Sequence, residues 1–247
     1  MQIVLYDGTP FSFLTLLYEY VLEKREEPIP KIYNLLLRKE RAGLFTKEIS
    51  PDYNKALKLK EILRAHLGEP FLKRLYHFYL CDSAFLEETL IKGLRRALEN
   101  PEIVSHITDE DFGKLARAEK ELFRERHRWL GMLRFIEVTK GILLAVYEPK
   151  FNTTPLLTSH FMKRFPQERF IIFDSLRKIL FSYRVFNEKE IFFGRVENFE
   201  FEIAENDAFI ELFKTYFDNI SIPERKSLKR QRQRAPLKIR KFLVEFS

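Results

Sequence analysis

The stretch ILLAVYEPKFNTTPLLTSHFMKRFPQERFIIFD, residues 142–174, decides the fold class of this chain. Its two ends, Ile142–Tyr147 and Phe170–Phe173, are short runs of aliphatic, β-branched and aromatic residues, which is the composition of a strand. Between them, Thr154–Phe165 has the length of a helix, with one proline near its start and another just past its end. The stretch therefore predicts two strands of a sheet and one helix that packs on that sheet.

Similar short β-rich runs lie on both sides of this stretch, at Met132–Val138, Ile179–Tyr183 and Ile191–Val196. Phe199–Ile203 alternates apolar and acidic residues, as a half-exposed strand does, and Asp207–Phe217 is expected to be a helix. We expect residues 127–220 to form an α+β region built on an antiparallel sheet with packed helices.

Residues 1–126 are expected to be mostly helical after a short strand at Ile3–Tyr6. Caps and apolar periodicity predict helices from Pro10 after an N-cap at Thr9, from Ser50-Pro51 to about His66, ended by Gly68, and from Thr108 to about His127. Between them, Phe71, Leu75 and Phe78 mark a further helical face, and Leu86 through Leu98 mark another. The fold class is therefore α+β, with a helical N-terminal half, an antiparallel sheet with packed helices, and a basic C-terminal segment.

That basic segment, residues 221–247, contains nine Lys or Arg and two acids, a net charge of +7. This is the net charge of the whole chain, so the other residues are neutral in sum. Its cations are Arg225, Lys226, Lys229, Arg230, Arg232, Arg234, Lys238, Arg240 and Lys241. A neutral body with one basic end attracts polyanions, so nucleic acid is the expected partner. A solvated basic tail would show the same charge, but apolar residues such as Leu228 and Phe242 indicate that the segment docks on the body.

Several classes of protein are disfavoured by what the sequence lacks. No apolar run approaches the roughly 20 residues that span a membrane, and the start has no signal-peptide layout, so we expect a cytoplasmic protein. Cys81 is the only cysteine, which excludes intrachain disulfides and cysteine-based metal clusters. There is no G-x-G-x-x-G, P-loop, H-E-x-x-H or G-x-S-x-G motif, so we expect no cofactor and no metal.

Residues His127–Phe135 combine the only tryptophan, Trp129, with His127, Arg128 and Arg134. An arginine beside an aromatic ring suits contact with a phosphate or a base, and His127 is a candidate catalytic residue. Alternatively, His127 and Trp129 close the interface between the two halves of the chain.

A second candidate group comprises His160, Arg164, Asp174 and Arg177. His160 and Arg164 are four residues apart on the expected helix and share one face. If that face meets the strand before Asp174, the four side chains form a proton-transfer or phosphate site, with His160 and Asp174 as catalytic candidates and Arg164, Arg177 and Arg134 as nucleic-acid contacts. A buried ion-paired network that holds the helix on the sheet is the alternative.

Taken together, motifs along nearly the whole chain resemble a bacterial family of DNA-metabolism or DNA-repair proteins that have an uncharacterised domain. They are Tyr6-Asp7-Gly8, Leu44-Phe45, His127-Arg128, Gly131, Arg134-Phe135, Glu148-Pro149, Asn152, Pro155-Leu156-Leu157, His160-Phe161, Arg164, Asp174, Arg177, Phe213-Lys214, Phe217, Ile220, Ile222, Arg225, Leu228, Gln231 and Pro236. Ser227 departs from the family's usual Asn, and Ile239-Arg240 from its usual Tyr-Trp pair.

The resemblance implies a role in DNA repair or modification beside a radical SAM protein, because members are encoded next to one. Some members are also fused to a uracil-DNA glycosylase domain. We expect a DNA-binding or adaptor protein that serves this radical SAM partner and is not a self-sufficient catalyst. A nucleic-acid-processing enzyme with a His/Asp/Arg site is the alternative, and an RNA-binding protein is a further one.

Overall fold

The computed structural model describes residues 3–35, 46–82, 86–139, 141–185, 188–197 and 199. The strand expected at Phe199–Ile203, apart from Phe199 itself, lies outside the described residues, as do the helix expected at Asp207–Phe217 and the whole basic segment. The chain divides into two compact units, Met1–Arg124 and Glu125–Ser247, called here the first and the second unit.

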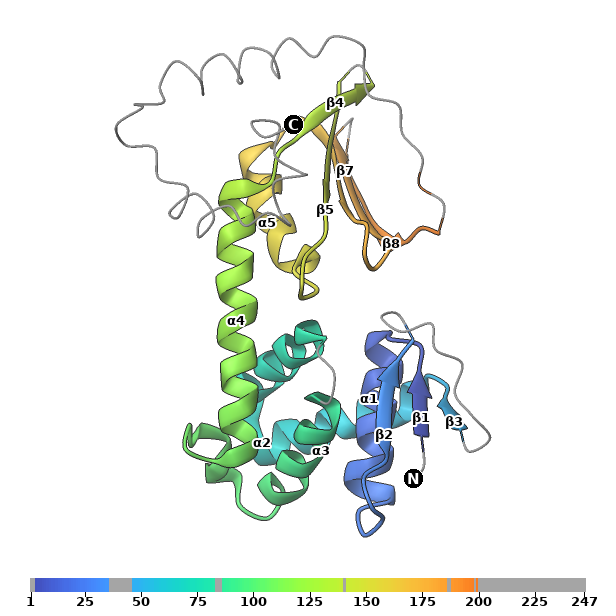
Figure 1. Ribbon diagram of the computed structural model, residues 1–247, viewed down its shortest axis with the longest axis vertical. Helices are drawn as coiled ribbons and strands as arrows, with labels where there is room; N and C mark the ends of the chain where they lie inside the picture. The colour runs from blue at the N-terminus through green and yellow to red at the C-terminus, as the bar shows by residue number, and fades with distance from the viewer. Residues whose placement is uncertain are drawn as a thin grey trace, which may run out of the picture. The chain divides into compact units, whose positions relative to one another are not determined.

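The first unit contains a three-stranded parallel sheet in the order β2-β1-β3. Its strands are β1 (Ile3–Tyr6), β2 (Lys31–Asn34) and β3 (Thr46–Ile49). Helix α1 (Pro10–Tyr18), extended by a π-helical turn over Glu19–Glu23, returns the chain from β1 to β2 (Figure 1). The sequence predicted β1, a run of four apolar residues, but missed β2 and β3, since each combines apolar with charged or polar residues in only four positions.

The first two helices of the first unit begin at side-chain caps. The Thr9 hydroxyl accepts from the Ser12 amide at 3.3 Å, as expected for an N-cap, and Asp52 caps α2 (Tyr53–Cys81) by accepting from the Lys55 amide at 3.1 Å. The later helices are α3 (Leu86–Ala97), a 3-10 turn over Pro101–Ser105, and α4 (Glu110–Met132), which contains the boundary between the units.

The helical break expected at Gly68 is confirmed as a bend in α2. Gly68 adopts φ 79° and ψ 168°, and a second helical arm that buries Phe71, Leu75 and Phe78 follows it. Helix α4 extends beyond its expected end at His127 to Met132, since residues 128–130 are compatible with a helix and the single Gly131 near its end is tolerated.

The core of the first unit forms around α1. Leu16 and Leu17 on this helix and Tyr20 in the π-helical turn that extends it are fully buried, and they belong to one apolar cluster with Val4 of β1 and Leu94 of α3. Apolar residues at intervals of three and four along α1 thus bury one continuous face, which is the main stabilising term for so short a helix.

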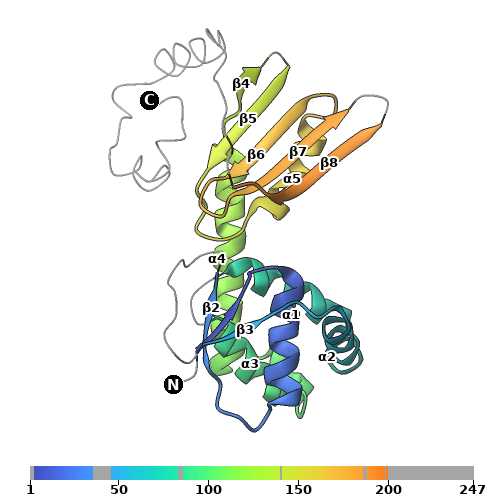
Figure 2. The same cartoon turned by 90° about the vertical axis from the view of Figure 1, so that its right-hand side faces the viewer.

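The second unit is built on a five-stranded sheet in the order β4-β5-β6-β7-β8 (Figure 2). Its strands are β4 (Ile136–Thr139), β5 (Ile142–Tyr147), β6 (Arg169–Asp174), β7 (Ile179–Val185) and β8 (Lys189–Arg195). The sheet was expected to be antiparallel and is mixed. β5 and β6 pair in parallel because α5 (Thr154–Arg164) carries the chain back to the edge where β5 began, whereas the other neighbours are antiparallel.

Helix α5 lies against one face of this sheet (Figure 2). Its buried residues Leu157 and Phe161 join a cluster with Phe170 of β6, and Phe135 adds edge-to-face contacts with Phe161 and Phe170 at centroid distances of 5.0 and 5.8 Å. Leu144 and Phe173 belong to a smaller cluster on the opposite face. Among the described residues, no helix combines the length and the apolar composition that a membrane crossing needs.

Candidate functional site

Polar side chains gather in the second unit where β5 and β6 end, since parallel neighbours place their carboxyl ends at one edge of the sheet. We call Tyr147, Thr153, Thr154, Asp174 and Arg177 the β5–β6 cluster. The Tyr147 hydroxyl lies 2.8 Å from the Thr154 hydroxyl and 3.3 Å from that of Thr153, at the start of α5. Ligands of open α/β sheets commonly bind at this edge, so the exposure of the cluster to solvent decides whether it can bind one.

The centre of the cluster is an ion pair that is buried from solvent. Arg177 Nη1 lies 3.0 Å from Asp174 Oδ2, and the two residues are 1% and 0% exposed. The guanidinium also donates to the carbonyl oxygens of Pro149 at 3.1 Å and Lys150 at 2.8 Å, while the amides of Leu176 and Arg177 donate to Asp174 Oδ1. The pair therefore holds the loop after β5 against the turn after β6.

Burial dominates the titration of this cluster. It raises the pKa of the Asp174 carboxyl, although the Arg177 charge and the hydrogen bonds to the ionised form oppose the rise. Burial also raises the pKa of the Tyr147 hydroxyl well above its usual range, and the neighbouring Asp174 charge adds to the rise. The hydrogen-bonded contacts of the pair are those of a structural network.

His160 and Arg164 stand apart from this pair. His160 is half-buried with its ring perpendicular to that of Phe161, and Arg164 is exposed, with its guanidinium 5.7 Å from the Phe165 ring centroid. Within the described parts of the chain, no hydrogen bond or ion pair joins either residue to Asp174 or Arg177. The structure thus brings together two of the four predicted side chains, because Phe161, and not His160, lies on the helix face packed against the sheet.

The predicted group around Trp129 is divided among different surroundings. His127 and Arg128 are exposed on α4, whereas Trp129 is buried and lies edge-to-face on Tyr147 at 4.9 Å. Arg134 is half-buried and donates to the Gly131 carbonyl at 3.0 Å. Successive helical residues point about 100° apart, so adjacent positions in the sequence do not share one surface.

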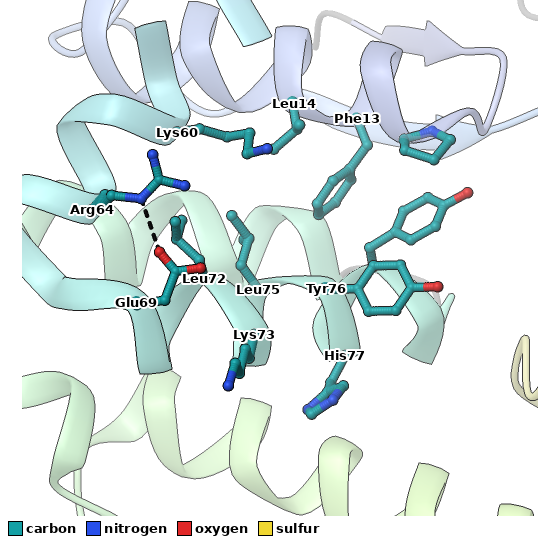
Figure 3. Close-up of a pocket in the computed structure, with 12 residues that line it drawn as sticks. Phe13, Leu14, Lys60, Arg64, Glu69, Leu72, Lys73, Leu75, Tyr76 and His77 are labelled. Atoms are coloured by element: carbon teal, nitrogen blue, oxygen red, sulfur yellow. Dashed lines mark hydrogen bonds and ion pairs between the residues drawn. The ribbon is translucent and has the colours of Figure 1, made fainter. Parts of the chain in front are cut away.

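The first unit contains a pocket that the sequence analysis missed (Figure 3). It has a volume of about 440 Å³ and lies between α1 and the bent helix α2. Lys60 and Arg64, four residues apart on α2, were a readable signal of a basic face. The rest of the lining could not be predicted from the sequence, because it forms only where α1 packs beside both arms of α2.

Comparison with known families decides the classification. Residues 85–245 match the family DUF4130, a domain of unknown function. The chain belongs to the DUF4130 family. No curated protein and no solved structure matches the chain.

The DUF4130 match contains the β5–β6 cluster and every candidate residue named from the sequence, from His127 to Lys238. The cations of the basic segment belong to it but lie outside the described residues. The resemblance was expected along nearly the whole chain, but the family match starts only at residue 85. It therefore does not include the residues that line the pocket of the first unit. Among the described residues, no group of three or more His, Cys, Asp or Glu is arranged to hold a metal ion.

Proposed function

We propose that this DUF4130 protein is a nucleic-acid-binding subunit, with DNA as its target, that serves a separate enzyme of DNA repair or modification. The observation that carries the proposal is the placement of charge. Residues 1–220 contain equal numbers of acidic and basic residues, so the entire excess of +7 falls within the last 27 residues. Such a local excess is the electrostatic signature of binding to a phosphate backbone.

The contacts of the candidate catalytic residues favour a binding subunit over an enzyme. A general base has to reach the proton that it removes, yet Asp174 is fully buried and hydrogen-bonded to Arg177. His160 has no hydrogen bond to an acid among the described residues that would orient its ring. If the protein were instead a nucleic-acid-processing enzyme, its catalytic residues would have to be others than Asp174 and His160.

The proposed enzyme partner is the radical SAM protein implied by the family resemblance. An iron–sulfur cluster of the usual kind needs several cysteine thiolates, and this chain has the single Cys81, which is buried in the first unit. Under the proposal, DNA contact resides in this chain and the radical chemistry in its partner. A tagged full-length chain should then co-purify with that radical SAM protein.

The DNA-binding part is tested by salt dependence. If about 4–6 cations of the basic segment contact phosphates, log affinity for duplex DNA should fall with log salt with a slope of about −4 to −5. In the full chain, joint replacement of Arg225, Lys226, Lys229 and Arg230 by Gln should remove most of this slope, measured by fluorescence anisotropy.

The matched control removes four exposed cations of the first unit, Lys58, Lys92, Arg117 and Lys120, also by Gln. It should leave the slope within about one unit of the wild-type value. Equal slopes for the wild-type chain and the basic-segment variant would contradict the proposal. Tighter binding to RNA than to DNA of the same sequence would assign the protein to RNA instead.

A further inference from the structure

The pocket of the first unit combines two kinds of surface. Pro10, Phe13 and Leu14 of α1 form one wall, and the two arms of α2 form the other (Figure 3). Because α2 bends at Gly68, residues on both arms of this helix line the same pocket. The volume of about 440 Å³ is within the range of small-molecule sites, roughly 300–1,000 Å³.

One part of the lining is aromatic. The rings of Tyr76 and Tyr79 are stacked with centroids 6.3 Å apart and planes at 26°, and the Tyr79 hydroxyl donates to the Gly8 carbonyl at 2.9 Å. This hydrogen bond holds Tyr79 against the turn before α1. Tyr76 is 44% exposed, so it offers a ring to a ligand, while the nearby Phe13 is almost fully buried.

The other part of the lining is basic. Lys60, Arg64 and Lys73 contribute three positive charges and Glu69 one negative charge. Glu69 lies 2.8 Å from Arg64 and is thereby paired, whereas neither lysine has an acidic partner within 4 Å among the described residues. Nδ1 of His77 lies within hydrogen-bond distance of Glu119 Oε1, at 2.7 Å, so this nitrogen already has a partner. The ion pair with Glu69 uses only Nε of Arg64, so among the described residues its two Nη groups have no acidic partner. The pocket thus has a net positive lining in which Lys60, Lys73 and the Nη groups of Arg64 are available to an anion.

We propose that this pocket binds a nucleotide, with its base against the ring of Tyr76 and its phosphate between Lys60 and Arg64. A planar base fits because stacking on an exposed aromatic ring needs a flat π-face. A phosphate fits because it accepts from a guanidinium fork and an ammonium group together. The nucleotide is either a free molecule or one residue of a nucleic-acid strand, and the two sources share this chemistry.

The site is independent of the basic segment and of the matched DUF4130 residues, so it extends the proposed function and does not rest on it. Isothermal titration calorimetry of the full chain with adenosine 5′-monophosphate tests it, with adenosine, inorganic phosphate and decanoate as comparison ligands. We expect the nucleotide to bind about tenfold or more tightly than adenosine or phosphate alone. Absence of nucleotide binding, or decanoate binding that the nucleotide does not displace, would overturn the proposal.

Two variants locate the bound nucleotide in the pocket. Lys60→Glu reverses an exposed charge of the lining, and Tyr76→Leu removes a half-exposed ring but keeps an apolar side chain. Each should weaken nucleotide binding about tenfold. The matched controls on the same helix are Lys58→Glu, an exposed lysine outside the lining, and Tyr53→Leu, a tyrosine that is 60% exposed. Equal losses in the variants and their controls would overturn the placement of the ligand.

The source of the nucleotide is decided by comparing thymidine 5′-monophosphate with a short oligothymidylate. Equal affinity assigns the pocket to free nucleotides, and affinity for the strand at least about tenfold higher, lost in Tyr76→Leu, assigns it to a strand. The variant with four glutamines in the basic segment should bind the mononucleotide as the wild type does. Unchanged binding there separates the pocket from the proposed DNA contact, whereas its loss would show that the nucleotide binds elsewhere.

Discussion

Each unit contains a strand–helix–strand crossover between parallel neighbours, β1–α1–β2 and β5–α5–β6, but the two units use the space near the start of the crossover helix differently. In the second unit, Asp174 and Arg177 bind one another and the nearby backbone. In the first unit, a pocket beside α1 contains two lysines, Lys60 and Lys73, that have no acidic partner within 4 Å among the described residues. Polar groups that hydrogen-bond to one another within the chain have a structural role, whereas charged groups left exposed in a pocket can bind a ligand.

The two units also differ in how they bury an acid. Asp174 has the Arg177 guanidinium beside it, whereas Glu87 accepts a hydrogen bond from the Tyr6 hydroxyl at 2.7 Å and has no ion-pair partner among the described residues. Burial raises the pKa of Glu87 to about 7, the Tyr6 hydrogen bond acting against the rise. The two buried acids should therefore respond differently to mutation and to pH.

Removal of the guanidinium in Arg177→Met should have the largest effect. It would leave the Asp174 charge buried without a partner and two backbone carbonyls without their donor, at a cost of about 3–5 kcal/mol in the free energy of unfolding. Urea unfolding followed by the fluorescence of Trp129, which is buried in the second unit, measures this loss.

The control for this variant is Lys163→Met, which removes an exposed cation from α5. It should change the free energy of unfolding by no more than about 0.5 kcal/mol. Similar small effects of both substitutions would refute the structural role that we assign to the Asp174–Arg177 pair.

Glu87→Gln should abolish a pH dependence that is specific to the first unit. The folded-state pKa of Glu87 is about 7 and the usual value is 4.5, so the folded protein retains a proton that the unfolded chain loses. The resulting stabilisation is complete below pH 4.5 and disappears as the pH rises through 7, a change on the order of 3 kcal/mol.

Urea unfolding of the helices, followed by circular dichroism at several pH values, compares the wild type with Glu87→Gln. The wild type should lose stability between pH 4.5 and 7 relative to the variant. Parallel stability curves for the two proteins across this window would show that the carboxyl group is ionised throughout, contrary to our interpretation of its burial.

His160→Ala should have the smallest effect, about 1 kcal/mol or less, because the side chain is half-buried and has no hydrogen-bond partner among the described residues. His127→Ala, at an exposed position, is its comparison. Neither should alter the processing of DNA that carries uracil, alkylated bases or pyrimidine dimers, since we expect no turnover by the purified chain. Turnover that His160→Ala eliminates would make the second unit a catalyst and overturn the proposed function.

The sequence correctly predicted the caps of two helices of the first unit. Thr9 caps α1 as expected, and Asp109 accepts from the amides of Asp111 and Phe112 at 3.0 and 2.9 Å at the start of α4. These features depend on residues within one helical turn of each other, and caps of this kind are readable in a linear sequence. Gly68 separates the two arms of α2 as expected, because its positive φ interrupts the helix.

Of the candidate site, the sequence found the Asp174–Arg177 pair but assigned it partners that it does not have. It placed the two residues three apart after a strand, and their contact follows from that spacing. Whether His160 also reaches them depends on the rotation of α5 against the sheet, which Leu157 and Phe161 determine by their packing on Phe170. The candidate residues of the basic segment remain predictions, since they lie outside the described residues.

The sequence by itself determined the separation of charge, the absence of common cofactor motifs, the caps and the strand–helix–strand order of residues 142–174. Only the tertiary structure decided that β5 and β6 run in parallel, that Asp174 and Arg177 are closed to solvent, and that a pocket opens beside α1. The physical reason is the range of the interactions. Pairing, burial and cavities depend on residues far apart in the chain, such as Tyr6 and Glu87 at a separation of 81 positions, whose contact no local pattern records.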